Sequence, residues 1–268
     1  MRSRARRGGR LLRFNLALVF VFLYTPLVVL VILSFNRSKF ASAWGGFSTQ
    51  WYGVLFRDGP VIHAVGTTFF IAIMATTVSI ALGLPLALGL ERYRRSAALD
   101  GAVYFPLLIP DIVTGIGLLS FFATIKFPLG ERSIIIAHSV WGIAFATAII
   151  RTRLRDFDRS IEEASLDLGV KELKTFFKIT LPVIWPGIIA AALVVFTLSV
   201  DEFVIAYFTA GTTVTFPIQI YSMIRFGITP EINAVATILL SVTMLSIVTA
   251  TLVIGRRGSR TRMEEAQT

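Results

Sequence analysis

The sequence predicts an all-α polytopic membrane protein with six transmembrane helices and both termini in the cytoplasm. Its 268 residues are 55% hydrophobic and 16% charged, whereas charged residues make up about a quarter of an ordinary soluble domain. The apolar residues fall in runs of roughly twenty or more, long enough for a helix to cross a hydrocarbon layer about 30 Å thick. Basic residues are concentrated in alternate connecting segments. These observations exclude an ordinary water-soluble enzyme.

Hydropathy places the spans one after another along the chain. Residues 1–13 form a basic N-terminus, residues 14–254 a single transmembrane domain, and residues 255–268 a tail. The first span is interpreted as a retained anchor. The alternative, a secretory signal cleaved near Ala41-Ser42-Ala43, is less favoured because the apolar run exceeds the 7–15 residues of a signal core. The six spans cover residues 14–35, 67–90, 99–124, 133–150, 183–209 and 234–254.

The charges between the spans predict the orientation. Twenty of the 26 Arg and Lys residues lie in segments on the side of the termini, and six lie in the opposite segments. Because basic residues favour the cytoplasmic side, both termini are predicted to be cytoplasmic. This distribution leaves no compact basic face for nucleic acid, despite a formal charge of +10. The sequence contains no cysteine, which excludes a disulfide scaffold and a thiolate metal site.

The segment 151–182 is the one sizeable soluble element that the sequence predicts. Its first half repeats small and apolar residues at helical spacing, and Gly169 is suited to end that helix in the left-handed conformation. Its second half carries another apolar stripe, which Pro182 is predicted to end. Taken alone, this pattern is also that of an amphipathic hairpin resting on the membrane surface. The two stripes consist of Ile161, Ala164, Ser165 and Leu168, and of Val170, Leu173, Phe176 and Phe177.

This segment resembles the EAA loop of the inner-membrane permeases of ABC importers. The spacing is complete: Glu163-Ala164-Ser165, three residues, Gly169, nine residues, Ile179, one residue, and Leu181-Pro182. Ser165 stands where the pattern has a second alanine. In that family the loop is a coupling element that docks in a cleft of a cytoplasmic ATPase. The resemblance implies the same role for these seven residues, and we refer to 151–182 as the coupling loop.

Further segments resemble the second permease subunit of spermidine/putrescine importers. They are SFN at 34–36, GFSTQWY at 46–52, PDIV at 110–113, LSVDEFVIAYFTAG at 198–211 and YSMIRFGITPEINAVATILL at 221–240. The resemblance implies a type I importer permease fold in the bacterial inner membrane and uptake of polyamines. It also implies three partners: a second, related permease in a heterodimer, a dimeric ABC ATPase that uses ATP and Mg, and an extracytoplasmic substrate-binding protein. No cofactor is expected on this chain. Another amine, an amino-acid-like compound, a phosphonate or a metal ion are alternative solutes.

Three acidic residues within apolar sequence are candidates for the substrate path. They are Asp111, Asp201 and Glu202. An ionised carboxylate at mid-membrane costs roughly 2.5–3.5 kcal/mol on an insertion scale, so all three are expected to face protein or water. Pro106 and Pro110 are predicted to bend the third span and to free backbone carbonyls beside Asp111. Such a setting suits an ammonium group, through charge-assisted hydrogen bonds.

For other residues in or near the spans, the sequence gives weaker evidence of a functional role. Tyr104 and Tyr207 are candidates for cation–π contacts with the substrate. An alternative for Asp201 and Glu202 is structural pairing with a partner permease. His63 and His138 lie near predicted span ends and are interpreted as interfacial or capping residues, which leaves little material for a metal site.

Several motifs are absent from the sequence. It contains no GxxxxGK[ST], so the chain lacks a P-loop for ATP hydrolysis, and it contains no HExxH or GxSxG. Gly115-Ile116-Gly117 lies inside a span and is typical of close helix packing. The competing class is an ion-coupled secondary transporter. Six spans are few for a complete carrier, and a docking loop has no purpose in one, so the permease interpretation is preferred.

Overall fold

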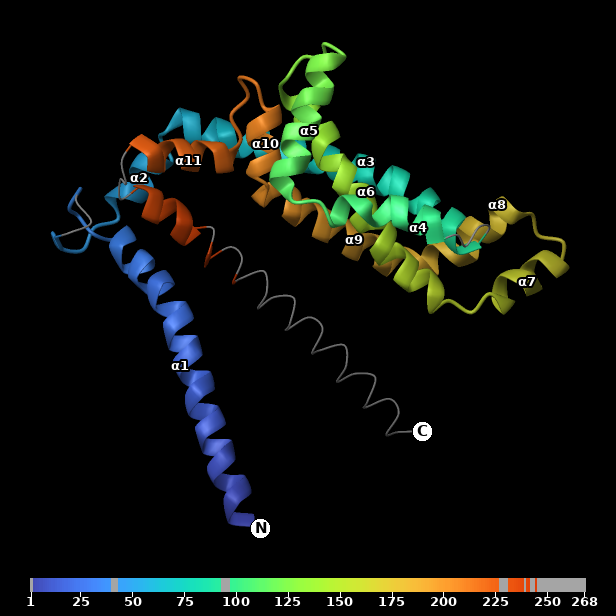
Figure 1. Cartoon of the computed structure of the whole chain (residues 1–268), viewed down its shortest axis with the longest axis horizontal. Coiled ribbons are helices and arrows are strands. Elements are labelled where there is room, and N and C mark those ends of the chain that lie inside the picture. The colour runs from blue at the N-terminus through green and yellow to red at the C-terminus, as the bar shows by residue number, and fades with distance from the viewer. Residues whose placement is uncertain are drawn as a thin grey trace. The chain divides into compact units, whose positions relative to one another are not determined.

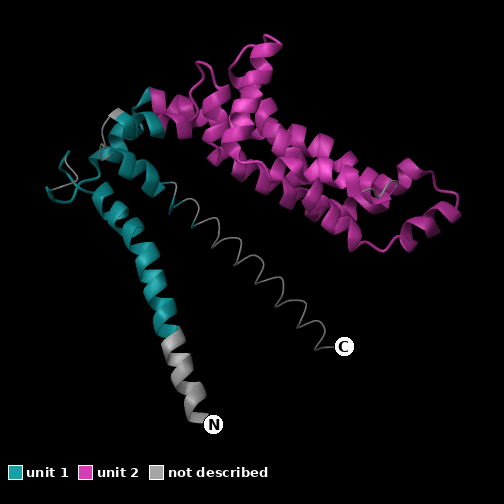
Figure 2. Ribbon diagram, in the orientation of Figure 1, with its two compact units in different colours: residues 1–59, 220–268 teal, residues 60–219 magenta. Residues whose placement is uncertain are grey.

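The computed structural model describes residues 2–39, 43–92, 97–226 and 231–238, together with 240, 241 and 244. Over these residues the named elements are all helices, which confirms the predicted all-α class. The chain divides into two compact units, one formed by residues 1–59 and 220–268 and the other by residues 60–219 (Figure 2). Among the described helices four are long and apolar enough to cross a membrane, or five when a bent pair counts as one span.

The first unit contains an exposed apolar helix and a loop held by one asparagine. Along α1 (Arg2–Ser34) the side chains from Phe14 to Val28 are exposed and largely apolar, so this helix needs lipid or another chain around it. The following loop closes on Asn36, whose Oδ1 accepts the backbone N–H of Gly45 at 2.8 Å. In α2 (Gln50–Leu55), Trp51 donates its Nε1–H to the carbonyl of Asn36 at 2.7 Å. The segment 34–36 therefore has a structural role.

The second unit is built on three long helices that lie side by side, α3, α6 and α9 (Figure 1). Small residues permit their close approach: Gly142 of α6 lies against Ser79 of α3, and Gly83 lies against Ala146. The elements of this unit are α3 (Gly59–Arg92), α4 (Ala97–Tyr104), η1 (Phe105–Leu107), α5 (Asp111–Thr124), α6 (Glu131–Arg155), α7 (Ser160–Asp167), α8 (Glu172–Thr175), η2 (Phe176–Thr180), α9 (Leu181–Asp201) and α10 (Val204–Thr209); α11 (Phe216–Phe226) follows.

The third predicted span, 99–124, is two helices joined by a sharp bend. The pair formed by Ala97–Leu107 and Asp111–Thr124 is bent by 97°. Pro110 has a φ of −57° and a ψ of 138°, which is extended rather than helical backbone. Pro106 and Pro110 also lack the N–H groups that a continuous helix would need. The prediction that these two prolines bend the span is confirmed.

The fifth predicted span, 183–209, differs from the structure at both ends. The helix is continuous from Glu172 to Asp201, so the prediction that Pro182 ends the second amphipathic helix is wrong. The wide π-helical turn of η2 accommodates Pro182, because this proline has no N–H for the carbonyl one turn back. The helix stops at Glu202, and α10 is a separate short helix. The sixth predicted span, 234–254, lies mostly outside the described residues.

Candidate coupling and transport sites

The coupling loop is attached to the ends of the long helices through buried polar side chains. Ser165 of α7 and Thr175 of α8 are 8% and 4% exposed, and their hydroxyl oxygens lie 2.9 Å apart. Glu162 is also buried and accepts hydrogen bonds from Thr180 and from Arg92 of α3. Its partners are therefore at the ends of α3 and α9, which fixes α7 against both helices.

The start and the corner of this loop are each held by the chemistry of one residue, Asp158 at the start and Gly169 at the corner. The backbone N–H of Ser160 donates to the carboxylate of Asp158 at 3.0 Å. This bond lowers the pKa of Asp158, because it stabilises the ionised form. Gly169 separates α7 from α8 and has a φ of +78°, the left-handed conformation that the sequence predicts there and that suits glycine.

The opposite side of the coupling loop is apolar and exposed. Leu168, Leu173 and Phe177 are 84%, 74% and 61% exposed, and Ile161 is half exposed at 49%. The first predicted stripe, which starts at Ile161, is divided, because Ser165 is buried while the other three members are exposed. Of the seven residues of the EAA pattern, Glu163, Ala164, Gly169 and Pro182 are exposed, Ile179 and Leu181 are half-buried, and Ser165 is buried.

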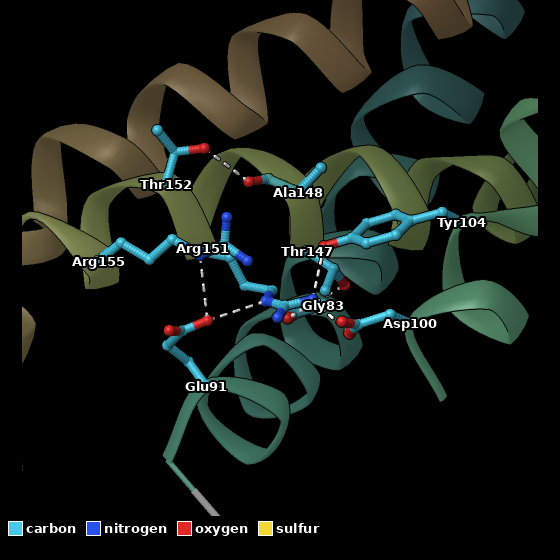
Figure 3. A network of polar contacts seen from close by, with 9 residues as sticks. All are labelled: Gly83, Glu91, Asp100, Tyr104, Thr147, Ala148, Arg151, Thr152 and Arg155. Carbon is cyan, nitrogen blue, oxygen red and sulfur yellow. Dashed lines mark hydrogen bonds and ion pairs between the residues drawn. The ribbon is translucent and has the colours of Figure 1, made fainter. Parts of the chain in front are cut away.

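A buried arginine joins three helices near this loop (Figure 3). Arg151 of α6 is 3% exposed, and its Nε donates to Glu91 Oε2 of α3 at 3.2 Å. Its Nη1 donates to Asp100 Oδ1 at 2.6 Å and to the Tyr104 hydroxyl at 2.9 Å, both in α4. Arg155 donates to Glu91 as well, at 3.3 Å.

In the sequence these basic residues serve as markers of orientation, and the charge count does not predict their network. The available signal was acidic: Glu91 and Asp100 are carboxylates next to strongly basic segments at the ends of predicted spans. The predicted span 133–150 also stops one residue before Arg151, whereas α6 continues to Arg155. The helix can carry a buried arginine because two carboxylates surround the guanidinium.

The three acidic candidates lie at two chain breaks, and the helices that follow these breaks, α5 and α10, pack against each other. Asp111 begins α5 after the bend, and Asp201 and Glu202 end α9. α10 packs against α5, and the charges of Asp111 and Asp201 both act on Glu202, which places the three carboxylates near one another. Asp111 and Asp201 are exposed in this chain. Glu202 is half-buried and accepts the backbone N–H of Ile205 at 2.8 Å, so it caps α10.

The two tyrosine candidates and His138 contact residues other than the three carboxylates. Tyr104 bonds to Arg151, while Tyr207 of α10 is 47% exposed and lies among the rings of Phe203 and Phe208. His138 is buried, with Nδ1 2.8 Å from Ser199 Oγ of α9. The prediction of an interfacial or capping role for His138 is therefore wrong, because α6 starts a full two turns earlier and packs this residue against α9.

His63 is exposed, as a residue at an interface would be. No group of three potential metal ligands occurs in the part of the chain that the structure describes.

Comparison with known proteins identifies the family of the chain. Residues 79–260 match the model of the binding-protein-dependent transport system inner membrane component. The chain belongs to this family. It is accordingly a multi-pass inner-membrane transport subunit, not an enzyme.

Two relatives of this permease are proteins of Escherichia coli strain K12. The putrescine transport system permease protein PotI is 44% identical over 235 residues, which cover 84% of each chain. The spermidine/putrescine transport system permease protein PotC is 34% identical over 249 residues, which cover 91% of this chain and 94% of PotC.

Solved structures share the fold of the permease at low sequence identity. A bacterial ABC transporter involved in the import of the acidic polysaccharide alginate has a chain with a TM-score of 0.68 and 15% identity, covering 92% of this chain and 95% of that one. The MetNI methionine ABC transporter in an inward-facing conformation gives a TM-score of 0.61 at 18% identity, covering 78% of this chain and 98% of that one.

Proposed function

We propose that the chain is the transmembrane permease subunit of an ATP-driven importer that takes up polyamines, putrescine or spermidine. The observation that carries the proposal is the 44% identity to a putrescine permease over 84% of both chains. The relative of the spermidine/putrescine system supports the same class of substrate over 91% of this chain. Both substrates are short, flexible polycations, so the transport path must offer negative charge without binding too tightly for release.

The acidic cluster supplies such a path. Asp111 and Asp201 are exposed at helix breaks. Carboxylates in an apolar span are unfavourable against lipid, so their exposure in the single chain is best explained by a water-filled path or a second permease. An ammonium group would form charge-assisted hydrogen bonds with them. Glu202 has a different role, because its carboxylate already caps α10.

The exposed apolar side of the coupling loop is the docking surface for the ATPase. Leu168 and Leu173 would be costly to leave in water, and a partner groove that covers them gains their burial. Ala164 of α7 is exposed as well, and its small side chain allows close approach of a partner. Because the sequence contains no P-loop, the partner must bind and hydrolyse ATP with Mg.

The remaining partners follow from the same arrangement. The excess of basic residues on one side supports cytoplasmic termini and a cytoplasmic coupling loop. The exposed apolar length of α1 supports contact with lipid and with a second, related permease that completes the path. A binding protein outside the membrane would deliver the polyamine to the heterodimer.

Uptake into proteoliposomes tests the proposal. The tagged chain is purified with its partners, reconstituted with ATP inside and the binding protein outside, and assayed with labelled putrescine and spermidine. Asp111→Asn should lower uptake about tenfold or more, because a hydrogen bond to a charged group contributes about 1.5–3 kcal/mol. Basal ATP hydrolysis and assembly should stay unchanged. Glu131→Gln, at an exposed carboxylate at the start of α6, is the matched control.

Two results would count against separate parts of the proposal. Normal uptake by the Asp111→Asn transporter would remove this carboxylate from the path. Wild-type vesicles that import another solute but neither polyamine would remove the proposed substrate.

A further inference from the structure

The last two residues of α3 bind two different parts of the molecule. Arg92 points to the coupling loop, where its Nη2 is ion-paired with Glu162 Oε1 of α7 and lies 3.4 Å from the hydroxyl of Thr180. Thr180 also donates to Glu162. The side chains of Arg92 and Glu162 are 18% and 11% exposed, and Thr180 is buried.

The neighbouring residue, Glu91, binds in the other direction. It is 8% exposed and accepts hydrogen bonds from Arg151 and Arg155 of α6. Arg151 continues the connection into α4 through Asp100 and Tyr104 (Figure 3). A single turn of α3 thus holds the coupling loop on one side and, through one arginine, the first half of the broken span on the other.

The broken span leads directly to the acidic cluster. Tyr104 ends α4, and Asp111 follows only seven positions later in the sequence, beyond η1 and the 97° bend. In contrast, Asp201 lies 19 positions after Pro182, the end of the coupling loop, which is about 30 Å along α9 at about 1.5 Å per residue. The route through the end of α3 therefore joins the loop to the element that carries Asp111.

We propose that Glu91 and Arg92 are positioning residues that make the broken span follow the movement of the coupling loop. The proposal rests on the function proposed above. A shift of α7 that left α3 behind would strand the Glu162 carboxylate in a buried place without its cation, which is strongly unfavourable. A shift of α3 would part Arg151 of α6 from Glu91, and a shift of α4 would part it from Asp100, so either movement on its own breaks one ion pair of a buried guanidinium. The loop, α3, α4 and the end of α6 therefore move as one body.

Charge reversal across the Arg92–Glu162 pair tests this role. Arg92→Glu and Glu162→Arg are prepared singly and together in the complete transporter, and putrescine uptake and ATP hydrolysis are measured in the same vesicles. Each single variant should lower uptake per ATP hydrolysed about tenfold while the ATPase still co-purifies. The double variant should recover most of the wild-type uptake per ATP hydrolysed, the coupling ratio. Arg132→Glu reverses an exposed arginine near the other end of α6 and should leave the ratio unchanged.

Each other result overturns the inference. An unchanged ratio in the single variants would show that the pair does not transmit movement. Uptake and ATP hydrolysis that fall in proportion would show a structural role only, and so would a double variant that fails to recover. If charge reversal prevents assembly, Arg92→Gln and Arg92→Lys give the same comparison. Uptake per ATP hydrolysed should fall about tenfold in Arg92→Gln and should be partly retained in Arg92→Lys.

The wild-type transporter separates this inference from the proposed substrate. Vesicles that take up no polyamine would contradict the substrate alone. The pair would then be judged by the stimulation of ATP hydrolysis by the binding protein, which the single variants should lose and the double variant should regain.

Discussion

Replacing Arg151 by methionine removes the centre of the network between α3, α4 and α6. The substitution keeps a flexible apolar stem in place of the arginine's but deletes hydrogen bonds to Glu91 at 3.2 Å, to Asp100 at 2.6 Å and to the Tyr104 hydroxyl at 2.9 Å. Removing one partner of a buried ion pair costs about 3–5 kcal/mol, because the other charge stays buried. Two features place Arg151→Met at the low end of this range.

The carboxylates differ in how well they tolerate the loss. Glu91 is 8% exposed but keeps Arg155 at 3.3 Å, so its charge is only partly stranded. Asp100 is 35% exposed and can bond to water instead. We therefore expect the free energy of unfolding to fall by about 3 kcal/mol, most of it through Glu91. Adding Glu91→Gln to Arg151→Met should recover about 1 kcal/mol or more of that loss, since the stranded charge is then gone.

Titration of the purified chain with SDS in mixed micelles, followed by tryptophan fluorescence, measures these free energies. Arg132→Met, at an exposed arginine of the same helix, is the control and should change stability by less than about 0.5 kcal/mol. A loss below about 1 kcal/mol for Arg151→Met would refute the reasoning, because it would mean that removing Arg151 leaves no costly buried charge on Glu91. Strict additivity of the two substitutions would refute the direct pairing of Glu91 with Arg151.

Two further predictions concern the packing of the long helices and the docking surface. Gly142→Ala places a methyl group against the Ser79 hydroxyl and 3.1 Å from Val195 Cγ1, so it should destabilise the fold by about 1–3 kcal/mol in the same titration. Ser79→Ala should relieve part of this cost, and no relief would argue against the contact. Leu168→Glu should abolish co-purification of the ATPase while stability changes by less than about 0.5 kcal/mol, because the side chain is 84% exposed. Leu168→Met keeps an apolar side chain and should retain the ATPase, whereas equal recovery with both variants would exclude this leucine from the interface.

Local patterns in the sequence predicted the parts of the fold that depend on neighbouring residues. Hydropathy located the long helices, because crossing a membrane requires a continuous apolar run. Pro106 and Pro110 predicted the bend, since the loss of N–H groups acts on the same helix. Gly169 predicted the left-handed corner for the same local reason. Pro182 does not end its helix as the local pattern predicts, because a π-helical turn removes the conflict that a proline normally creates.

The contacts between distant residues could not be read from these patterns. Glu162 and Ile161 are adjacent, and helical spacing alone gave no reason to bury the carboxylate and expose the isoleucine. The structure buries Glu162 because Arg92, 70 positions earlier in the sequence, meets it at the end of α3.

The sequence by itself therefore determined the class of the protein, the places of its long helices and the pattern of its coupling loop. The tertiary structure alone decided that Glu91, 60 positions before Arg151, makes that arginine part of a buried network. It also brought the breaks at Asp111 and Glu202 together. The physical reason is that hydropathy and helical periodicity are properties of neighbouring residues, whereas the partner of a buried charge is chosen by the packing of whole helices.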